Sequence, residues 1–179
     1  MQMLQRKIIA LIFIMLTLNS FSQSSKFNID SLRSLVKKYS IENPEIAAIN
    51  CNRLYTQIRN NPNDTLKALY HISMSEYKSG TGLTADALNH IDSAISIAQS
   101  NKNQNIHIEA LLNKSALLLK SGNYSEAIKV NEKARLIALK EKNKHLLIQS
   151  LLLRGDIYKE IGQYNDALAK KTEALAIAK

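Results

Sequence analysis

A pattern that recurs after forty residues is the feature of this sequence that most constrains its fold. The stretch GNYSEAIKVNEKARLIA at residues 122–138 returns as GQYNDALAKKTEALAIA at residues 162–178. The positions kept in both copies are Gly122 and Gly162, Tyr124 and Tyr164, Ala127 and Ala167, and Ala134 and Ala174. A fixed period of this size is typical of proteins built from stacked repeats, which usually present surfaces rather than catalyse reactions.

The same period extends toward the N-terminus. Ala87 and Ala94 keep the seven-residue spacing of the alanines, and Gly82 lies forty residues before Gly122. No stretch alternates apolar and polar residues in the manner of a strand. We therefore predict an all-α chain, an α-solenoid of helix-turn-helix repeats. The predicted segments are a linker over 23–30, an N-terminal helical pair over 31–60 and three repeats over 64–179, at about 64–100, 106–142 and 145–179.

Polar residues mark the expected helix ends. Asn43-Pro44-Glu45 is typical of a helix start, because proline suits the first helical position and an acid suits the first turn. The other expected N-terminal caps are Asp30, Asp64 or Thr65, and Asn123 acting with Glu126 as a reciprocal pair.

Small residues explain why the repeat needs its pattern. Gly122 and Gly162 follow the first helix of each pair, where a left-handed turn residue costs glycine nothing. Alanines seven apart lie on one face and let paired helices approach closely. Gly155 and Tyr158 are structural positions of the third repeat. Tyr77 is one residue out of step with Tyr158, which predicts one extra residue in the first turn.

The pattern G-x-Y-x-x-A, followed six residues later by alanine, resembles the tetratricopeptide repeat. The resemblance covers residues 64–179, and its period of forty is similar to that of the elongated class found in kinesin light chain. The sequence departs from the family where Tyr70, Leu111 and Leu151 replace tryptophan. Lys114 and Arg154 replace aliphatic residues, and we expect their stems to pack while their charges reach water.

The resemblance implies that the first helix of each pair lines a concave groove that binds a peptide or a helix. The groove residues that it implies are His71, Ser75, Lys78, Leu112, Ala116, Leu119, Lys120, Leu152, Asp156 and Lys159. An exposed apolar groove would suit such a ligand. It is an equal alternative that neighbouring elements cover the leucines, so that they do not form an exposed groove. The lysine and asparagine set with which some family members clamp a terminal carboxylate is missing, since Asn113 alone does not make that site.

The first 22 residues have the pattern of a secretory signal peptide. Arg6 and Lys7 precede the apolar run IIALIFIMLTL at 8–18, and Ser20 and Ser22 supply small residues near an expected cleavage at Gln23. The run is shorter than the roughly 20 residues of a membrane span. We expect export to the periplasm or the outside of the cell; a retained N-terminal anchor is the alternative.

The net charge of the chain limits the kinds of partner that it can be expected to bind. The formal net charge of +9 falls to +7 without Arg6 and Lys7, and acids interrupt the basic residues along the chain. This pattern is typical of solvated helix faces rather than of a nucleic-acid site. It favours an acidic protein or peptide as the partner. A membrane becomes a partner only if the leader is retained or the chain continues.

No residue pattern in the sequence indicates a catalytic site or a metal site. Cys51, the only cysteine, forms no intrachain disulfide and is expected on an apolar helix face. His71, His90, His107 and His145 have no metal-ligand spacing, so isolated boundary positions are expected. No nucleophile, phosphate-loop or metalloprotease motif occurs. We expect no enzyme activity, no cofactor and no metal.

Two functions remain open. The first is an exported protein-interaction scaffold. The second is the sensory input domain of a longer membrane-bound bacterial regulator with a kinase or DNA-binding output. Leu168, Leu175 and Ile177 have no following helix to cover them, which predicts continuation of the chain, end-to-end self-association or a capping partner.

Overall fold

The computed structural model describes residues 28–60 and 62–179. The predicted signal peptide over 1–22 and the cleavage site near Gln23 lie outside the described residues. Residues Leu32–Lys179 form one compact unit, which holds nearly all of the described helices.

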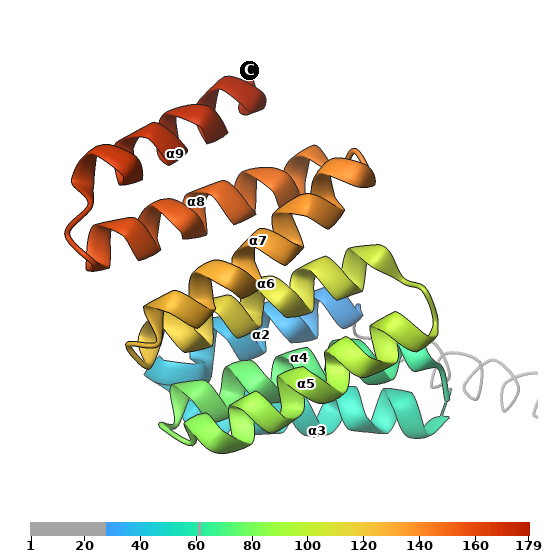
Figure 1. Ribbon diagram of the computed structural model, residues 1–179. Coiled ribbons are helices and arrows are strands. Elements are labelled where there is room, and N and C mark those ends of the chain that lie inside the picture. Colours follow the sequence, from blue (N-terminus) through green and yellow to red (C-terminus); the bar gives the residue numbers. More distant parts are fainter. Residues whose placement is uncertain (1–27, 61) are drawn as a thin grey trace, which may run out of the picture. The chain divides into compact units, whose positions relative to one another are not determined.

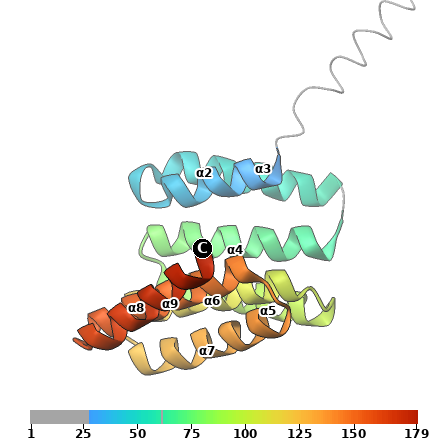
Figure 2. The ribbon, with the colours of Figure 1, turned by 90° about the horizontal axis from the view of Figure 1, so that it is seen from above.

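Every regular element in the described ranges is an α-helix, which confirms the predicted class. The eight helices are α2 (Ile29–Glu42), α3 (Pro44–Asn60), α4 (Asp64–Gly80), α5 (Thr84–Ser100), α6 (Gln104–Lys120), α7 (Tyr124–Lys140), α8 (Lys144–Glu160) and α9 (Tyr164–Ala178). Consecutive helices pack as antiparallel pairs (Figure 1). In the view of Figure 2, α2 and α3 form one layer and α4 lies next to it.

The helices keep an unbroken forty-residue register. α4, α6 and α8 begin at 64, 104 and 144, and each has 17 residues. The turns after them span 81–83, 121–123 and 161–163. The first turn is therefore no longer than the others, and the extra residue predicted from Tyr77 is wrong. Tyr77 corresponds to Leu117 and Ile157, one position before Tyr158.

One device closes five successive turns. Gly82, Gly122 and Gly162 have positive φ, and so do Lys102 and Lys142 in the turns between pairs. In each turn the next backbone N–H reaches back five residues, as when Asn123 donates to the Leu118 carbonyl at 2.8 Å. This Schellman closure needs the left-handed conformation that the glycines were predicted to supply.

Asparagines cap the first helix of each repeat. The side chains of Asn63, Asn103 and Asn143 accept from backbone N–H groups in α4, α6 and α8. The prediction of Asp64 or Thr65 as the cap is wrong, because both lie inside α4. These three asparagines are forty residues apart, so the sequence carried the signal.

Two other predicted caps are corrected. Asp30 lies within α2, and its backbone N–H donates to Asn28 Oδ1 at 3.0 Å. Asn123 precedes α7 but makes no side-chain capping hydrogen bond. The Schellman bond already holds the Asn123 backbone, so the turn positions α7 without help from the side chain. The start of α3 at Pro44 is as predicted.

Alanines form the centre of the helix pairs. The buried alanines at the predicted positions are Ala87, Ala94, Ala127, Ala134, Ala167 and Ala174. Larger residues such as Ile72, Ile91, Ile108 and Leu151 fill the space between these close contacts. The pattern of small and large residues is what lets each helix pack on its neighbours at native density.

Two glycines permit the closest helix contacts. A Cβ at Gly155 would lie 2.9 Å from Lys171 Cγ and 3.1 Å from the Ala167 carbonyl oxygen, so Gly155 lets α9 approach α8. A Cβ at Gly80 would lie 2.3 Å from the Ser40 carbonyl oxygen on α2. Both positions need glycine for space, not for backbone conformation.

Within the described ranges, no helix has the length and the apolar content of a membrane span. Cys51 is buried in α3, as predicted, and burial together with the nearby Glu76 raises the pKa of its thiol to about 12. Such a thiol stays protonated and packs as a small apolar group.

Candidate functional site

The first helices of the repeats form a contiguous layer. α6 contacts α4 on one side and α8 on the other, whereas among the described helices α5 and α7 make no such contact with each other. Helices on the inner side of a curved stack approach their second neighbours, and helices on the outer side do not. The layer of α4, α6 and α8 is therefore the inner face.

Two cavities open on this face. The first has a volume of about 390 Å³ and is lined by α2, α4 and α6. The second, of about 450 Å³, lies between the C-terminal end of α6, the start of α7 and α8. Lys120 lines both cavities. We call the first cavity the α2–α4–α6 recess; its lining residues are Lys37, Ser40, Ile41, Ser75, Glu76, Ser79, Gly80, Asn113, Ala116, Leu117 and Lys120.

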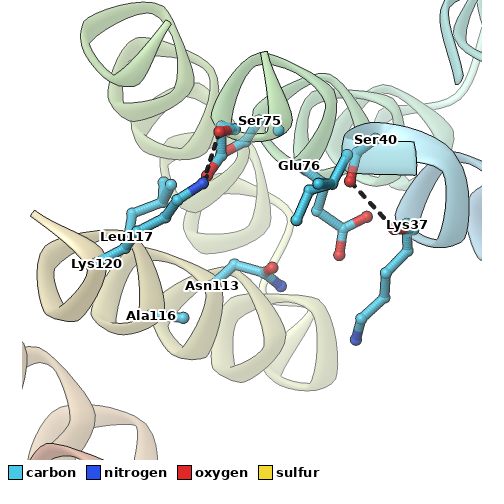
Figure 3. A pocket seen from close by; sticks show the side chains of 11 residues that line it. Lys37, Ser40, Ser75, Glu76, Asn113, Ala116, Leu117 and Lys120 are labelled. Atoms are coloured by element: carbon cyan, nitrogen blue, oxygen red, sulfur yellow. Dashed lines mark hydrogen bonds between the residues drawn. The ribbon is translucent and has the colours of Figure 1, made fainter. Parts of the chain in front are cut away.

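Glu76 is the central polar group of the recess. Figure 3 shows its carboxylate and the Asn113 side chain extending toward the same space. Burial raises the pKa of Glu76 to about 7, although Lys37 and Arg33 oppose this rise and Glu109 adds to it. A carboxyl group with that pKa changes charge near neutral pH, which is frequent at functional sites.

Cations flank Glu76 from two sides. Lys37 on α2 and Lys120 on α6 lie at opposite ends of the recess in Figure 3. The Lys120 ammonium donates to the Ser79 carbonyl oxygen at 2.8 Å, which holds it at the wall of the cavity. Arg33 and Glu109, close by on α2 and α6, form an ion pair with each other.

Six of the ten predicted groove residues line these cavities. Ser75 and Ala116 line the recess, Leu119, Asp156 and Lys159 line the second cavity, and Lys120 lines both. Ser75 is buried, so it contributes to the floor rather than to an exposed surface.

The other four predicted groove residues lie elsewhere. Leu112 is buried in the core cluster, which is the covered alternative for that leucine. Leu152 is exposed on α8. Lys78 forms an ion pair with Asp86 on α5 at 3.5 Å. His71 lies against His90 of α5.

Two histidines meet, against the expectation of isolated positions. His71 Nδ1 on α4 and His90 Nδ1 on α5 are 3.0 Å apart, a hydrogen-bonding distance between imidazoles. Burial lowers the pKa of both rings; the neighbouring imidazole lowers that of His71 further, and Lys78 lowers that of His90. The nineteen-residue separation matches no local motif, so only the hairpin brings the rings together. No group of three or more metal-ligating side chains occurs in the described part of the chain.

Arg154 corrects another expectation. Its guanidinium is buried and donates to Asn131 Oδ1 and the Ile128 carbonyl oxygen, at 3.0 and 2.9 Å, and to Glu132 at 3.0 Å. The charge is therefore neutralised inside the α7–α8 interface and does not reach water. The corresponding Lys114 ammonium pairs with Asp92 at 2.7 Å near the surface.

The last helix presents an apolar face. Tyr164 is 70 % exposed and Leu168 is 68 % exposed, and Leu175 lies on the same face. The equivalent residues of α7, Tyr124 and Ile128, pack against the core cluster. Ile177 also packs against that cluster, so its predicted exposure is wrong.

Sequence reasoning missed Glu76, Lys37 and Ser40 as residues of the recess. In the forty-residue register Glu76 corresponds to Ala116 and to Asp156, which was predicted to line the groove, so the repeat carried a signal for Glu76 that was not used. Lys37 and Ser40 lie on α2, outside the repeats to which the groove was assigned. A helical projection of α4 beside Ser75 could have found Glu76.

Residues 107–179 match the tetratricopeptide repeat family model. The tetratricopeptide match covers α7, α8, α9 and most of α6, and the helices before it keep the same length and spacing. No curated protein matches the chain. Tetratricopeptide arrays generally serve as protein-interaction scaffolds that bind on extended concave surfaces.

Proposed function

We propose that this chain is an exported protein-interaction scaffold that binds a peptide or a helix along the inner face of α4, α6 and α8. The observation that carries the proposal is the pair of cavities on this face, joined by Lys120. Tetratricopeptide repeats typically bind proteins or peptides, and the net charge, +9 for the whole sequence and +7 without Arg6 and Lys7, favours an acidic partner.

Peptide selection tests the groove. We would select peptides from a displayed random library against the chain and measure their binding to two tryptophan variants. Ala116→Trp places a bulky neutral ring at an exposed position of the recess, and Ala85→Trp makes the matched change at an exposed position of α5. Selected peptides should bind at least about tenfold more weakly to the first variant and normally to the second. Equal binding to both variants would place the binding surface elsewhere.

Export is tested separately. The basic residues Arg6 and Lys7 followed by the apolar run support a cleaved leader. Immunoblotting of cell fractions should show an exported species slightly smaller than 20.1 kDa, and Leu11→Arg should retain the full-length chain inside the cell. An unprocessed chain in the cytoplasm would contradict export without affecting the groove.

The apolar face of α9 favours a second partner. In α7 the equivalent face is covered by α8, so a helix is the natural cover for Tyr164 and Leu168. We propose that two copies meet through this face, because an apolar stripe is complementary to itself about a two-fold axis. Sedimentation should show a dimer that Leu168→Lys converts to monomer. A monomeric parent chain would remove this proposal.

The sensory input domain remains the second candidate, since a following segment of a longer protein would cover the same face. The immunoblot decides between the two. A much larger membrane-bound species would support the regulator, and a species near 20.1 kDa would support the scaffold.

A further inference from the structure

The α2–α4–α6 recess contains an acid whose hydrogen-bonding capacity is not used. Among residues 28–60 and 62–179, no side chain hydrogen-bonds or forms an ion pair with the Glu76 carboxylate, and no dashed line reaches it in Figure 3. Ser40 and Lys120, which line the same cavity, donate instead to backbone carbonyl oxygens. A partly buried carboxyl group without protein partners is costly unless a ligand or water completes its contacts.

The charges around Glu76 determine which ligand fits. Arg33 and Glu109 offset each other through their ion pair. Lys37 and Lys120 remain as two cations that face the cavity against the single acid Glu76, and the thiol of Cys51 behind it is neutral. A cationic ligand would meet two ammonium groups, whereas an anionic ligand would meet them favourably and would be repelled only by an ionised Glu76.

We propose that the recess binds acidic side chains of a peptide and that Glu76 takes up one proton when they bind. This inference rests on the proposed function and specifies its ligand. The protonated Glu76 donates its O–H to a ligand carboxylate, the Asn113 amide is a second donor, and one proton from solvent balances the exchange. No covalent bond changes.

Dimensions favour acidic side chains over a terminal carboxylate. Lys37 and Lys120 lie at opposite ends of the recess, so two separate anions match them better than one. The volume of about 390 Å³ is at the small end of ligand pockets, which span about 300–1,000 Å³. It accommodates short side chains rather than a whole helix.

Proton uptake has a measurable consequence. With the pKa of Glu76 near 7, binding at pH 8 includes protonation of an ionised acid, whereas at pH 6 the proton is mostly present. Affinity should therefore be up to about tenfold higher at pH 6 than at pH 8. Calorimetry in buffers of different ionisation enthalpy should detect the uptake of up to about one proton at the higher pH.

The test uses acetyl-Glu-Glu-amide as the probe, followed by NMR chemical shifts and calorimetry on the full chain. We expect binding that tightens as pH falls, and no binding of acetyl-Gln-Gln-amide. Glu76→Gln mimics the protonated acid, so it should bind the probe with a pH-independent affinity within about twofold of the parent at pH 6. Lys37→Gln and Lys120→Gln should each weaken binding by about threefold.

Matched controls separate the recess from general charge effects. Glu45→Gln makes the same change at an exposed position of α3 and should leave the pH dependence intact. Tighter binding at pH 8, loss of binding in Glu76→Gln, or no binding of the probe would each overturn the inference. So would a preference for acetyl-Gln-Gln with a free terminal carboxylate.

Failure of this inference and failure of the proposed function give different results. Neutral peptides that bind without pH dependence and are blocked by Ala116→Trp would keep the groove and remove the acidic ligand. If Ala116→Trp blocks no peptide, the groove itself is not the binding surface.

Discussion

Gly80 is the residue whose replacement tests the helix packing most directly. Alanine in a helix is normally about 1 kcal/mol more favourable than glycine. At Gly80, however, the added Cβ would lie 2.3 Å from the carbonyl oxygen and 2.5 Å from the carbonyl carbon of Ser40. We expect Gly80→Ala to destabilise the fold by about 1–3 kcal/mol in urea unfolding.

A change at Gly82 provides the control. Gly82 has a φ of +80° and open space around it, so Gly82→Ala should cost only about 1 kcal/mol through backbone strain. Ser40→Gly should not rescue Gly80→Ala, because the nearest atoms are backbone atoms. A stabilising effect of Gly80→Ala would show that α2 does not approach α4 so closely.

The histidine pair predicts a pH dependence of stability. The pKa values of His71 and His90 are lowered in the fold, so the unfolded chain binds more protons near its usual histidine pKa of about 6.5. Their contribution is complete above that pH and is lost as pH falls through it. The urea concentration at the unfolding midpoint should decrease as the pH is lowered from about 7.5 to about 5.5. The decrease should be smaller in His71→Gln.

Comparison among variants isolates this effect. Glu76 acts in the opposite direction, because its raised pKa lets the folded chain hold the extra proton. The parent must therefore be compared with His71→Gln at each pH. His145→Gln, which changes an exposed histidine beside Gln149, should behave like the parent. Identical slopes in the parent and His71→Gln would contradict the prediction.

At the scale of elements, the α7–α8 interface depends on one polar group. Asn131 is fully buried, donates to the Ser150 carbonyl oxygen at 3.0 Å and accepts from Arg154. Asn131→Ala should cost about 1–3 kcal/mol in unfolding free energy, because it leaves part of the buried guanidinium without a partner.

Replacing both members should be far less harmful. Asn131→Ile with Arg154→Met leaves Glu132 paired with Arg135 and fills the same space with apolar atoms. A buried charged group and its hydrogen-bond partner can often be replaced together by apolar residues without loss of stability, because no buried polar group is then left unpaired. We expect the double variant to unfold within about 1 kcal/mol of the parent, and an additive loss would contradict this account.

Sequence patterns predicted helices better than they predicted polar contacts. Glycines and alanines at fixed spacing revealed the repeats because their conformation and size act locally. The contacts of Arg154, His90 and Glu76 were not predicted, because the groups around each side chain come from other helices. The forty-residue period alone did not show that Asn131 would accept a hydrogen bond from Arg154 or that α2 would complete a recess around Glu76.

On the scale of the whole molecule, stability should vary along the stack. α9 buries only Ala167 and Ala174, whereas α6 buries eight residues. In the monomeric Leu168→Lys variant, amide hydrogens of α9 should therefore exchange by local opening and those of α6 only through global unfolding. Hydrogen exchange followed by mass spectrometry should show this gradient. Uniform protection of α6 and α9 in that variant would contradict the prediction.

The α7–α8 contact also has a consequence for how such a chain can grow or shrink. Equal helix and turn lengths would let residues 104–143 be removed and α5 joined to α8 without changing any turn. Ile91, the equivalent of Asn131, would then face Arg154, whose charge would have no amide oxygen to meet. The backbone geometry permits the forty-residue repeats in any order. The buried pair of Asn131 and Arg154, in contrast, requires that the repeat with the arginine directly follows the repeat with the asparagine.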